Sequence, residues 1–318
     1  MKAFIRRLSI KERKGFVNSI IYTIFSFMHL ILTKTILYHS KISYITLLFI
    51  SGSLLILMSF YRIFRLMKKF KSNKTENIKI NFIAGFNSFI SYFCLISSIN
   101  STSLTNIVFI TRLFPFFIIL NRIKESKLLS YHLAWFITYI ITFLFIFFPA
   151  LYRESGFGVL FCLFSICFKF SSYKYLSQAK GINIDFLMLN IGFYNTFFGG
   201  IIVITKFDQI EYISGFMWIL ILLNVMSSYF MKIFMNKVLR KNINERNDNE
   251  NTNNERNTNE LKLMILNIII MYFTLPIDFY IFGEKFYYNY LVLLFSFIEI
   301  FLFYKIVKKI LKSDIIYP

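Results

Sequence analysis

The chain is a succession of long apolar runs separated by short polar segments. Ten of these runs reach roughly 20 residues, the length that a helix needs to cross the hydrocarbon core of a bilayer. In lipid the backbone must satisfy its own hydrogen bonds, so spanning runs of this length are helical. They also lack the two-residue alternation of β-barrel strands. We therefore expect an all-α integral membrane protein with ten transmembrane helices. The predicted spans are 16–33, 44–61, 80–98, 103–121, 131–149, 157–173, 186–204, 213–231, 263–283 and 287–304.

Composition agrees with a membrane protein and narrows the class of partner. Hydrophobic residues make up 57% of the 318 residues, above the roughly 45–50% that is usual in soluble domains. The formal charge of +20 would suit a nucleic-acid-binding protein, but the basic residues lie between the apolar runs and no groove-reading module accompanies them. We expect a lipid bilayer, and no nucleic acid, as partner. Cys94, Cys162 and Cys167 lie in apolar runs, which is typical of buried free thiols.

The basic residues are distributed unequally between the two sides of the predicted membrane protein. With the N-terminus inside, the inside segments hold 29 Lys and Arg, and the outside loops hold five. The other two, Arg112 and Lys169, fall within spans. Because Lys and Arg are enriched in cytoplasmic loops, the distribution predicts a multi-pass protein with both termini cytosolic. Loss of any one span would reverse every later loop and spoil this agreement.

Ten spans divide into two halves of five. We assign residues 1–14 to a basic cytosolic N-terminus, 15–149 to the first half, 150–309 to the second half and 310–318 to a cytosolic C-terminal tail. Within the second half, residues 242–260 are polar and low in complexity, which predicts a disordered inside loop. A solvated linker is favoured there over a partner-binding segment.

The two halves contain a similar succession of elements. Residues 109–148 hold a span with Pro115, a short turn with Glu125, and a further span. Residues 271–305 repeat this order, with Pro276 in the first of their two spans. Because five spans per half is an odd number, the second copy enters the membrane from the opposite side. Inverted repeats of this kind are typical of secondary transporters, whose substrate site lies near the midplane between the copies.

The segment Ser98–His132 (SINSTSLTNIVFITRLFPFFIILNRIKESKLLSYH) and, more weakly, Leu275–Tyr288 resemble the drug/metabolite transporter superfamily, which includes the EamA-like, triose-phosphate and nucleotide-sugar carriers. The shared features are a short turn before the fourth helix, a proline within it and an acidic turn after it. The resemblance implies ten helices in two inverted five-helix repeats and alternating-access transport of small organic metabolites. It is also compatible with a homodimer, and it identifies no single subfamily.

Arg112 is the most informative candidate for substrate binding. It lies within the predicted span 103–121, three residues before Pro115. A charged side chain at that depth costs about 2.5–3.5 kcal/mol or more, so such residues normally face the bundle interior or a wet cavity. The guanidinium fork suits a carboxylate or phosphate, and the triose-phosphate and nucleotide-sugar branch has a similar basic residue before its helix-four proline. The alternative is a structural ion pair with Glu299.

Four further polar residues within spans are candidates for the cavity: Lys169, His29, Asn87 and Asn195. Lys169 and His29 occupy corresponding places in the two halves, at an offset near 140 residues. Lys169 could instead extend its ammonium group to the inner interface, and His29 could be a satisfied packing residue. For the two asparagines the alternative is an interhelical hydrogen bond.

Prolines and carboxylates near the end of each half complete the set of candidates. Pro115 and Pro276 either create discontinuous, cavity-lining helices or simply bend their helices. Asp278, two residues after Pro276, is a candidate for cation or proton coupling. For Glu299 a structural ion pair is favoured over a proton relay.

The sequence offers no reactive constellation for a membrane enzyme. None of the three histidines is followed closely by an acidic residue that could support general-base chemistry, no His/Cys cluster could hold a metal, and no nucleophile elbow, phosphate loop or channel filter is recognisable. Taken with this, the resemblance implies a secondary transporter for a small organic, anionic metabolite such as a phosphate ester or nucleotide sugar, with no cofactor and no metal. The alternative is a non-transporting polytopic scaffold or receptor, which would tolerate loss of Arg112.

Overall fold

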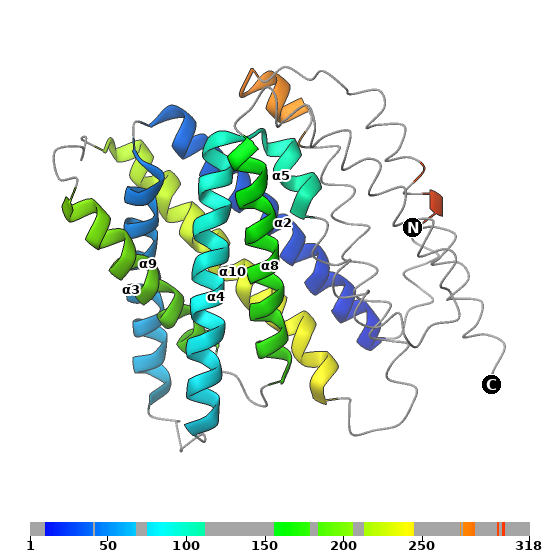
Figure 1. Ribbon diagram of the computed structural model, residues 1–318. Coiled ribbons are helices and arrows are strands. Elements are labelled where there is room, and N and C mark those ends of the chain that lie inside the picture. Colours follow the sequence, from blue (N-terminus) through cyan, green and yellow to red (C-terminus); the bar gives the residue numbers. More distant parts are fainter. Residues whose placement is uncertain are drawn as a thin grey trace.

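The computed structural model describes residues 10–40, 42–67, 75–111, 156–178, 184–205, 213–244, 274, 276–283, 298 and 301–302. These residues are almost entirely helical, and no strand occurs among them (Figure 1). The helices are α2 (Ile10–His39), α3 (Tyr44–Met67), α4 (Thr75–Ser101), α5 (Leu104–Thr111), α8 (Gly156–Gln178), α9 (Ile184–Thr205) and α10 (Gly215–Asn244).

Within these described ranges, six helices are long and apolar enough to cross a membrane. They correspond to the first, second, third, sixth, seventh and eighth predicted spans. The helical character of the prediction is therefore confirmed for this part of the chain, and the helices are consistent with a multi-pass membrane protein. The fourth predicted span begins with α5, while the fifth and most of the ninth and tenth lie outside the described residues. The six segments are Val17–His39, Tyr44–Phe64, Lys79–Ser101, Gly156–Leu176, Ile184–Thr205 and Gly215–Met235.

Large apolar side chains cover the outer faces of these helices. Leu57, Phe64, Phe157 and Ile204 are each more than 60% exposed. A soluble protein would bury such residues, whereas a bilayer solvates them. The described surface therefore suits contact with lipid.

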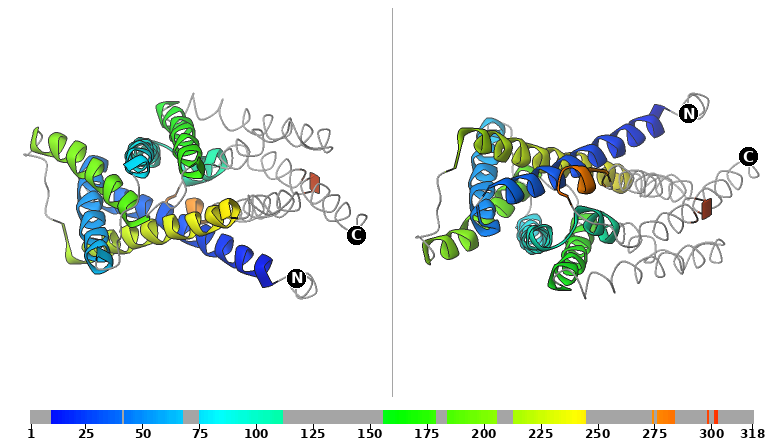
Figure 2. Two further views of the ribbon diagram at one scale, coloured as in Figure 1. Left: turned by 90° about the horizontal axis from the view of Figure 1, so that it is seen from below. Right: turned by 90° about the horizontal axis from the view of Figure 1, so that it is seen from above.

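The spanning helices pack in three main pairs that join segments far apart in the sequence. α3 lies against α9, α4 lies against α8, and α10 lies against α2 (Figures 1 and 2). α4 also contacts α9, which connects the first two pairs. Each pair combines one helix from before residue 150 with one from after it, so the two predicted halves are interleaved.

Glycines bring α3 and α9 into close contact. A Cβ added at Gly52 would lie 2.6 Å from Cβ of Asn195 and 2.7 Å from the backbone nitrogen of Thr196. A Cβ at Gly192 would lie 2.9 Å from the carbonyl oxygen of Gly52 and 3.0 Å from the nitrogen of Ile56. Small residues allow membrane helices to approach to this distance. The sequence could suggest close packing at glycines but not that these two would face each other.

Serines connect α4 with α8. The Ser88 and Ser172 hydroxyls are 2.7 Å apart, and the Ser165 hydroxyl donates to the carbonyl oxygen of Ser91 at 2.8 Å. Interhelical hydrogen bonds of this kind stabilise helix pairs in membranes, where packing cannot rely on the hydrophobic effect.

Several helix boundaries differ from the sequence prediction. α2 begins at Ile10, within the predicted N-terminal tail, and α10 continues to Asn244, within the predicted loop 242–260. The assignment of Lys34 to an outside loop is wrong, since Lys34 is a buried residue of α2. Its Nζ donates to the carbonyl oxygen of Thr102 at 2.7 Å, and this bond lets a lysine remain within an apolar helix.

Candidate functional site

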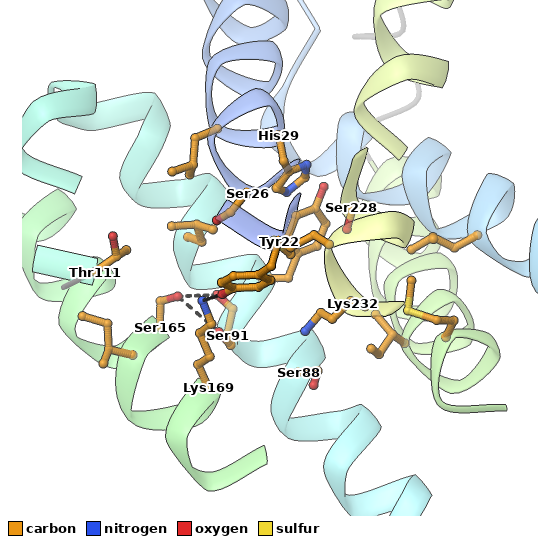
Figure 3. A pocket seen from close by; sticks show the side chains of 18 residues that line it. Tyr22, Ser26, His29, Ser88, Ser91, Thr111, Ser165, Lys169, Ser228 and Lys232 are labelled. Carbon is orange, nitrogen blue, oxygen red and sulfur yellow. Dashed lines mark hydrogen bonds between the residues drawn. The ribbon is translucent and has the colours of Figure 1, made fainter. Parts of the chain in front are cut away.

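A cavity of about 80 Å³ lies between the described helices (Figure 3). On α2, α3, α4 and α8 its lining residues lie near the middle of the span. That volume is enough for several waters or a small polar group. Every described spanning helix contributes to its wall, as does the end of α5. The lining residues are Tyr22, Ser26, His29, Leu30, Leu55, Ser88, Ser91, Tyr92, Leu95, Thr111, Ser165, Ile166, Lys169, Met188, Ile191, Ser228, Met231 and Lys232.

Two lysines extend into this cavity. Lys169 comes from α8 and Lys232 from α10, and Figure 3 shows both side chains directed toward the same space. Nζ of Lys169 donates to the hydroxyl of Tyr22 at 3.4 Å. The cavity therefore has a positively charged wall.

His29 and Tyr92 form an aromatic part of the wall. Their ring centroids are 5.5 Å apart in a stacked arrangement. Nδ1 of His29 lies 3.3 Å from the backbone carbonyl oxygen of Asn224. Because a carbonyl only accepts hydrogen bonds, Nδ1 carries the proton in this contact. Thr33 makes a second hydrogen bond between α2 and α10, since its hydroxyl donates to Oδ1 of Asn224 at 3.2 Å.

Helical spacing explains why polar groups from distant segments reach one place. On α10, Asn224, Ser228 and Lys232 are four residues apart, so they share one face of the helix. On α4, Ser88 and Tyr92 have the same spacing. The remaining surface of each helix is largely apolar and faces lipid or neighbouring helices.

Among the described residues that line the cavity there is no Asp or Glu. In the part of the chain that the structure describes, no group of three His, Cys, Asp or Glu side chains could hold a metal ion. With two lysines and several hydroxyls as its polar groups, the wall offers hydrogen-bond donors and positive charge. Such a wall suits an anionic, oxygen-rich solute.

A second polar cluster joins α3, α9 and α10 away from the cavity. NH1 of Arg62 donates to the hydroxyl of Tyr229 at 2.6 Å, and that hydroxyl donates to Oδ1 of Asp185 at 2.6 Å. Arg62 and Asp185 also lie 3.7 Å apart. None of the three is among the cavity-lining residues, so this cluster holds helices together.

The predicted substrate residues fall into two groups. Lys169 and His29 both line the cavity. Asn87 and Asn195 do not: the Asn87 amide donates to the Ser171 hydroxyl at 3.2 Å, and Asn195 is fully buried against Gly52. Asn87 therefore makes the interhelical hydrogen bond that was its alternative. Asn195 packs at the α3–α9 contact, but its buried amide atoms make no hydrogen bond, so that alternative is not met there.

The other candidates are placed only in part. Arg112, Pro115 and Glu299 lie outside the described residues. Pro276 is exposed and Asp278 is fully buried, and neither lines the cavity.

Lys232 was missed at the sequence level because it was counted among the basic residues of an inside loop. In the structure, Lys232 lies within the spanning segment Gly215–Met235. A signal was present, since the four-residue spacing from Asn224 through Ser228 continues to Lys232. Lys232 was not recognised as a cavity residue because the count of basic residues had already assigned it to an inside loop.

Comparison of the chain with protein-family models found no match, and comparison with curated proteins found no relative.

Proposed function

We propose that the chain is a secondary transporter that moves a small anionic metabolite across a membrane by alternating access, with the architecture of the drug/metabolite transporter superfamily. The observation that carries this proposal is the cavity near the middle of the spans, with two lysines and no carboxylate among its described lining residues. Transporters bind their substrates at this depth, between two structural repeats.

The pairing of helices supports an inverted repeat. α2, α3 and α4 correspond to α8, α9 and α10 at an offset of about 140 residues. A two-fold rotation that exchanges the halves would convert the α4–α8 pair into the α10–α2 pair and leave the α3–α9 pair unchanged. The three main pairs of the described helices are the ones that this rotation requires. Such an axis in the membrane plane is the basis of alternating access in many transporters.

The glycine contacts support the same axis at atomic distances. Gly52 and Gly192 are about 140 residues apart, as are Ile56 and Thr196. A Cβ at Gly52 would meet the nitrogen of Thr196, and a Cβ at Gly192 would meet the nitrogen of Ile56. These contacts exchange under the proposed rotation. The axis would pass between the two glycines, at the α3–α9 crossing.

The cavity also supports a role for Arg112. Thr111, the last residue of α5, lines the cavity, and Arg112 follows it directly in the chain. In this proposal the Arg112 guanidinium adds to the positive charge from Lys169 and Lys232.

Uptake into proteoliposomes tests the transporter proposal. The full chain would be reconstituted and supplied with labelled phosphate esters, nucleotide sugars and amino acids. We expect saturable uptake of an anionic member of this set, accelerated by unlabelled substrate on the opposite side. Ser26→Trp places a large ring in the cavity and should abolish uptake. Ile24→Trp, on the lipid-exposed face of the same helix, is the matched control and should leave it intact.

A scaffold or receptor would behave differently. It would show no saturable uptake of any of these solutes. Equal uptake by the Ser26→Trp and Ile24→Trp proteins would also contradict the proposal, because it would mean that solute does not pass through this cavity.

A further inference from the structure

Several elements meet beyond the cavity, at the end of the bundle where α2 and α4 end. The distribution of basic residues predicts that this end faces away from the cytosol, and we call it the outer end. On α2 the last described lining residue is Leu30, and Lys34 lies one turn beyond it. On α4 the last is Leu95, and Thr102 follows about two turns later. α5 and residues 276–283 lie at the same end (Figure 1).

Apolar side chains fill the space between the cavity and the outer end. They belong to one buried cluster, to which α2, α4, α5 and α8 all contribute. A solute in the cavity can therefore leave between these helices at the outer end only if they separate. Members of the cluster are Leu30, Ile99, Leu104, Val108, Val159 and Cys162.

One ammonium group connects the helices beyond this cluster. Nζ of the buried Lys34 donates to the carbonyl oxygen of Thr102 at 2.7 Å, directly after the last residue of α4. Carbonyl groups at the C-terminal end of a helix lack intrahelical partners and attract positive charge. Nζ also lies over the ring of Phe282, 5.7 Å from its centroid. Because a charged side chain within a span is costly and is usually retained for function, Lys34 is a candidate for more than packing.

The proposed rotation between the two halves gives Lys34 a counterpart at the opposite, inner end. At an offset of 140 residues, Lys34 corresponds to Lys174 of α8, and Thr102 corresponds to Asn242 in the last turn of α10. The two lysines differ in environment, since Lys34 is buried and Lys174 is exposed. In inverted-repeat transporters, one part of the protein moves against the other around a fixed site. If the two halves exchange their arrangements, Lys174 becomes buried at the end of α10 and Lys34 is released from the end of α4.

We propose that Lys34 and Lys174 are alternating gate residues. In the described conformation the hydrogen bond from Lys34 to Thr102 holds the outer end closed. When the cavity opens to the outer side this bond breaks, and Lys174 forms the corresponding bond with a carbonyl oxygen in the last turn of α10, which closes the inner end. The proposal rests on the proposed function and deepens it by naming the contacts that control access to the same cavity.

Thiol labelling tests the gate without requiring uptake. Ser26→Cys places a thiol in the cavity wall, in a full-length protein whose exposed Cys167 is replaced by serine. Intact cells or sealed vesicles would be treated with a membrane-impermeant maleimide from the outer side, which is the side that labels Ser43→Cys just beyond the end of α2. A protein without Ser26→Cys corrects for reaction of the buried Cys94 and Cys162.

Substitution of the two lysines should change the labelling rate in opposite directions. Lys34→Met removes the ammonium group and keeps a side chain of similar length. We expect it to raise labelling of Ser26→Cys from the outer side by about 10- to 100-fold, the effect on an equilibrium of losing one hydrogen bond from a charged donor. Adding Lys174→Met to this protein should return the rate toward its original value, because the outer-open conformation then loses its own contact. Lys79→Met, at an exposed lysine of α4, is the matched control and should leave the rate unchanged.

Gel filtration checks folding of each variant. If Lys34→Met does not fold, Lys174→Met alone should lower the outer labelling rate, since it replaces an exposed residue. The gate is overturned if folded Lys34→Met is labelled like Lys79→Met, or if Lys174→Met has no effect in either background. The outcome for the proposed function is separate. The expected labelling without uptake in proteoliposomes would contradict transport and leave the gate standing, whereas uptake with labelling that ignores both lysines would do the reverse.

Discussion

Tyr229 illustrates how single side chains stabilise the contacts between helices. Its hydroxyl accepts a hydrogen bond from Arg62 on α3 and donates one to Asp185 on α9, each at 2.6 Å. The guanidinium also lies over the Tyr229 ring, 5.6 Å from its centroid. One residue of α10 therefore connects two other helices. Arg62 is half exposed while Asp185 is mostly buried, so the carboxylate depends most on these partners.

Removing that hydroxyl should weaken the protein measurably. Tyr229→Phe takes away the donor to the buried Asp185 carboxylate and the acceptor for Arg62. We expect the free energy of unfolding to fall by about 1.5–3 kcal/mol, the usual effect of losing a hydrogen bond to a charged group. Titration of the purified protein from mild detergent into sodium dodecyl sulfate would measure it. Tyr61→Phe removes an exposed hydroxyl from α3 and should change little. Equal stability of the two variants would argue that Arg62 and Asp185 satisfy each other directly.

At the scale of elements, the described helices meet through small residues. α3 and α9 approach at Gly52 and Gly192, and α4 and α8 approach at paired serines. Small residues serve this purpose in membranes because association there depends on close contact and hydrogen bonding. The α3–α9 crossing is the tightest of these contacts to test, since backbone atoms of one helix lie directly against the other.

Gly52→Ala should separate α3 from α9. Its new methyl group would lie 2.6 Å from Cβ of Asn195 and 2.7 Å from the nitrogen of Thr196, so the helices must shift. Overpacking of this kind costs about 1–3 kcal/mol, which the same detergent titration would detect. Gly215→Ala is the matched control because nothing lies within 4 Å of its added Cβ. A Gly52→Ala protein as stable as Gly215→Ala would mean that this crossing is looser than described.

At the scale of the whole molecule, α3 and its neighbours determine which loops share a side of the membrane. Ser43 precedes α3 and Lys79 begins the spanning part of α4, so one crossing separates them. The excess of basic residues predicts that Lys79 lies on the cytosolic side. One experiment can test whether Ser43 and Lys79 lie on opposite sides of the membrane and which of them lies on the cytosolic side.

Labelling with a membrane-impermeant maleimide is that experiment. Cys94 and Cys162 are buried, so a Cys167→Ser background removes the exposed thiol among the described residues. We expect Ser43→Cys to be labelled from the non-cytosolic face of intact cells or vesicles and Lys79→Cys only after permeabilisation; both residues are exposed. The reverse result would contradict the predicted orientation, and labelling of both from one face would contradict the crossing by α3.

Run length, by itself, determined the helical character of this protein and the position of its spans. A stretch of about 20 apolar residues has few alternatives to a membrane-spanning helix, and the six described spans agree with that expectation. That information is local, because it depends on neighbours along the chain.

Only the tertiary structure decided which faces meet. Helical periodicity does not specify a helix's rotation or its partner, so the sequence could not show that Lys232 joins Lys169 in one cavity, or that Asn87 and Asn195 lie in helix contacts instead. A lysine near the end of a span is equally compatible with a loop, an interface or a cavity. Lys34 was misassigned for that reason, since its place within α2 depends on a carbonyl oxygen contributed by Thr102, distant in sequence.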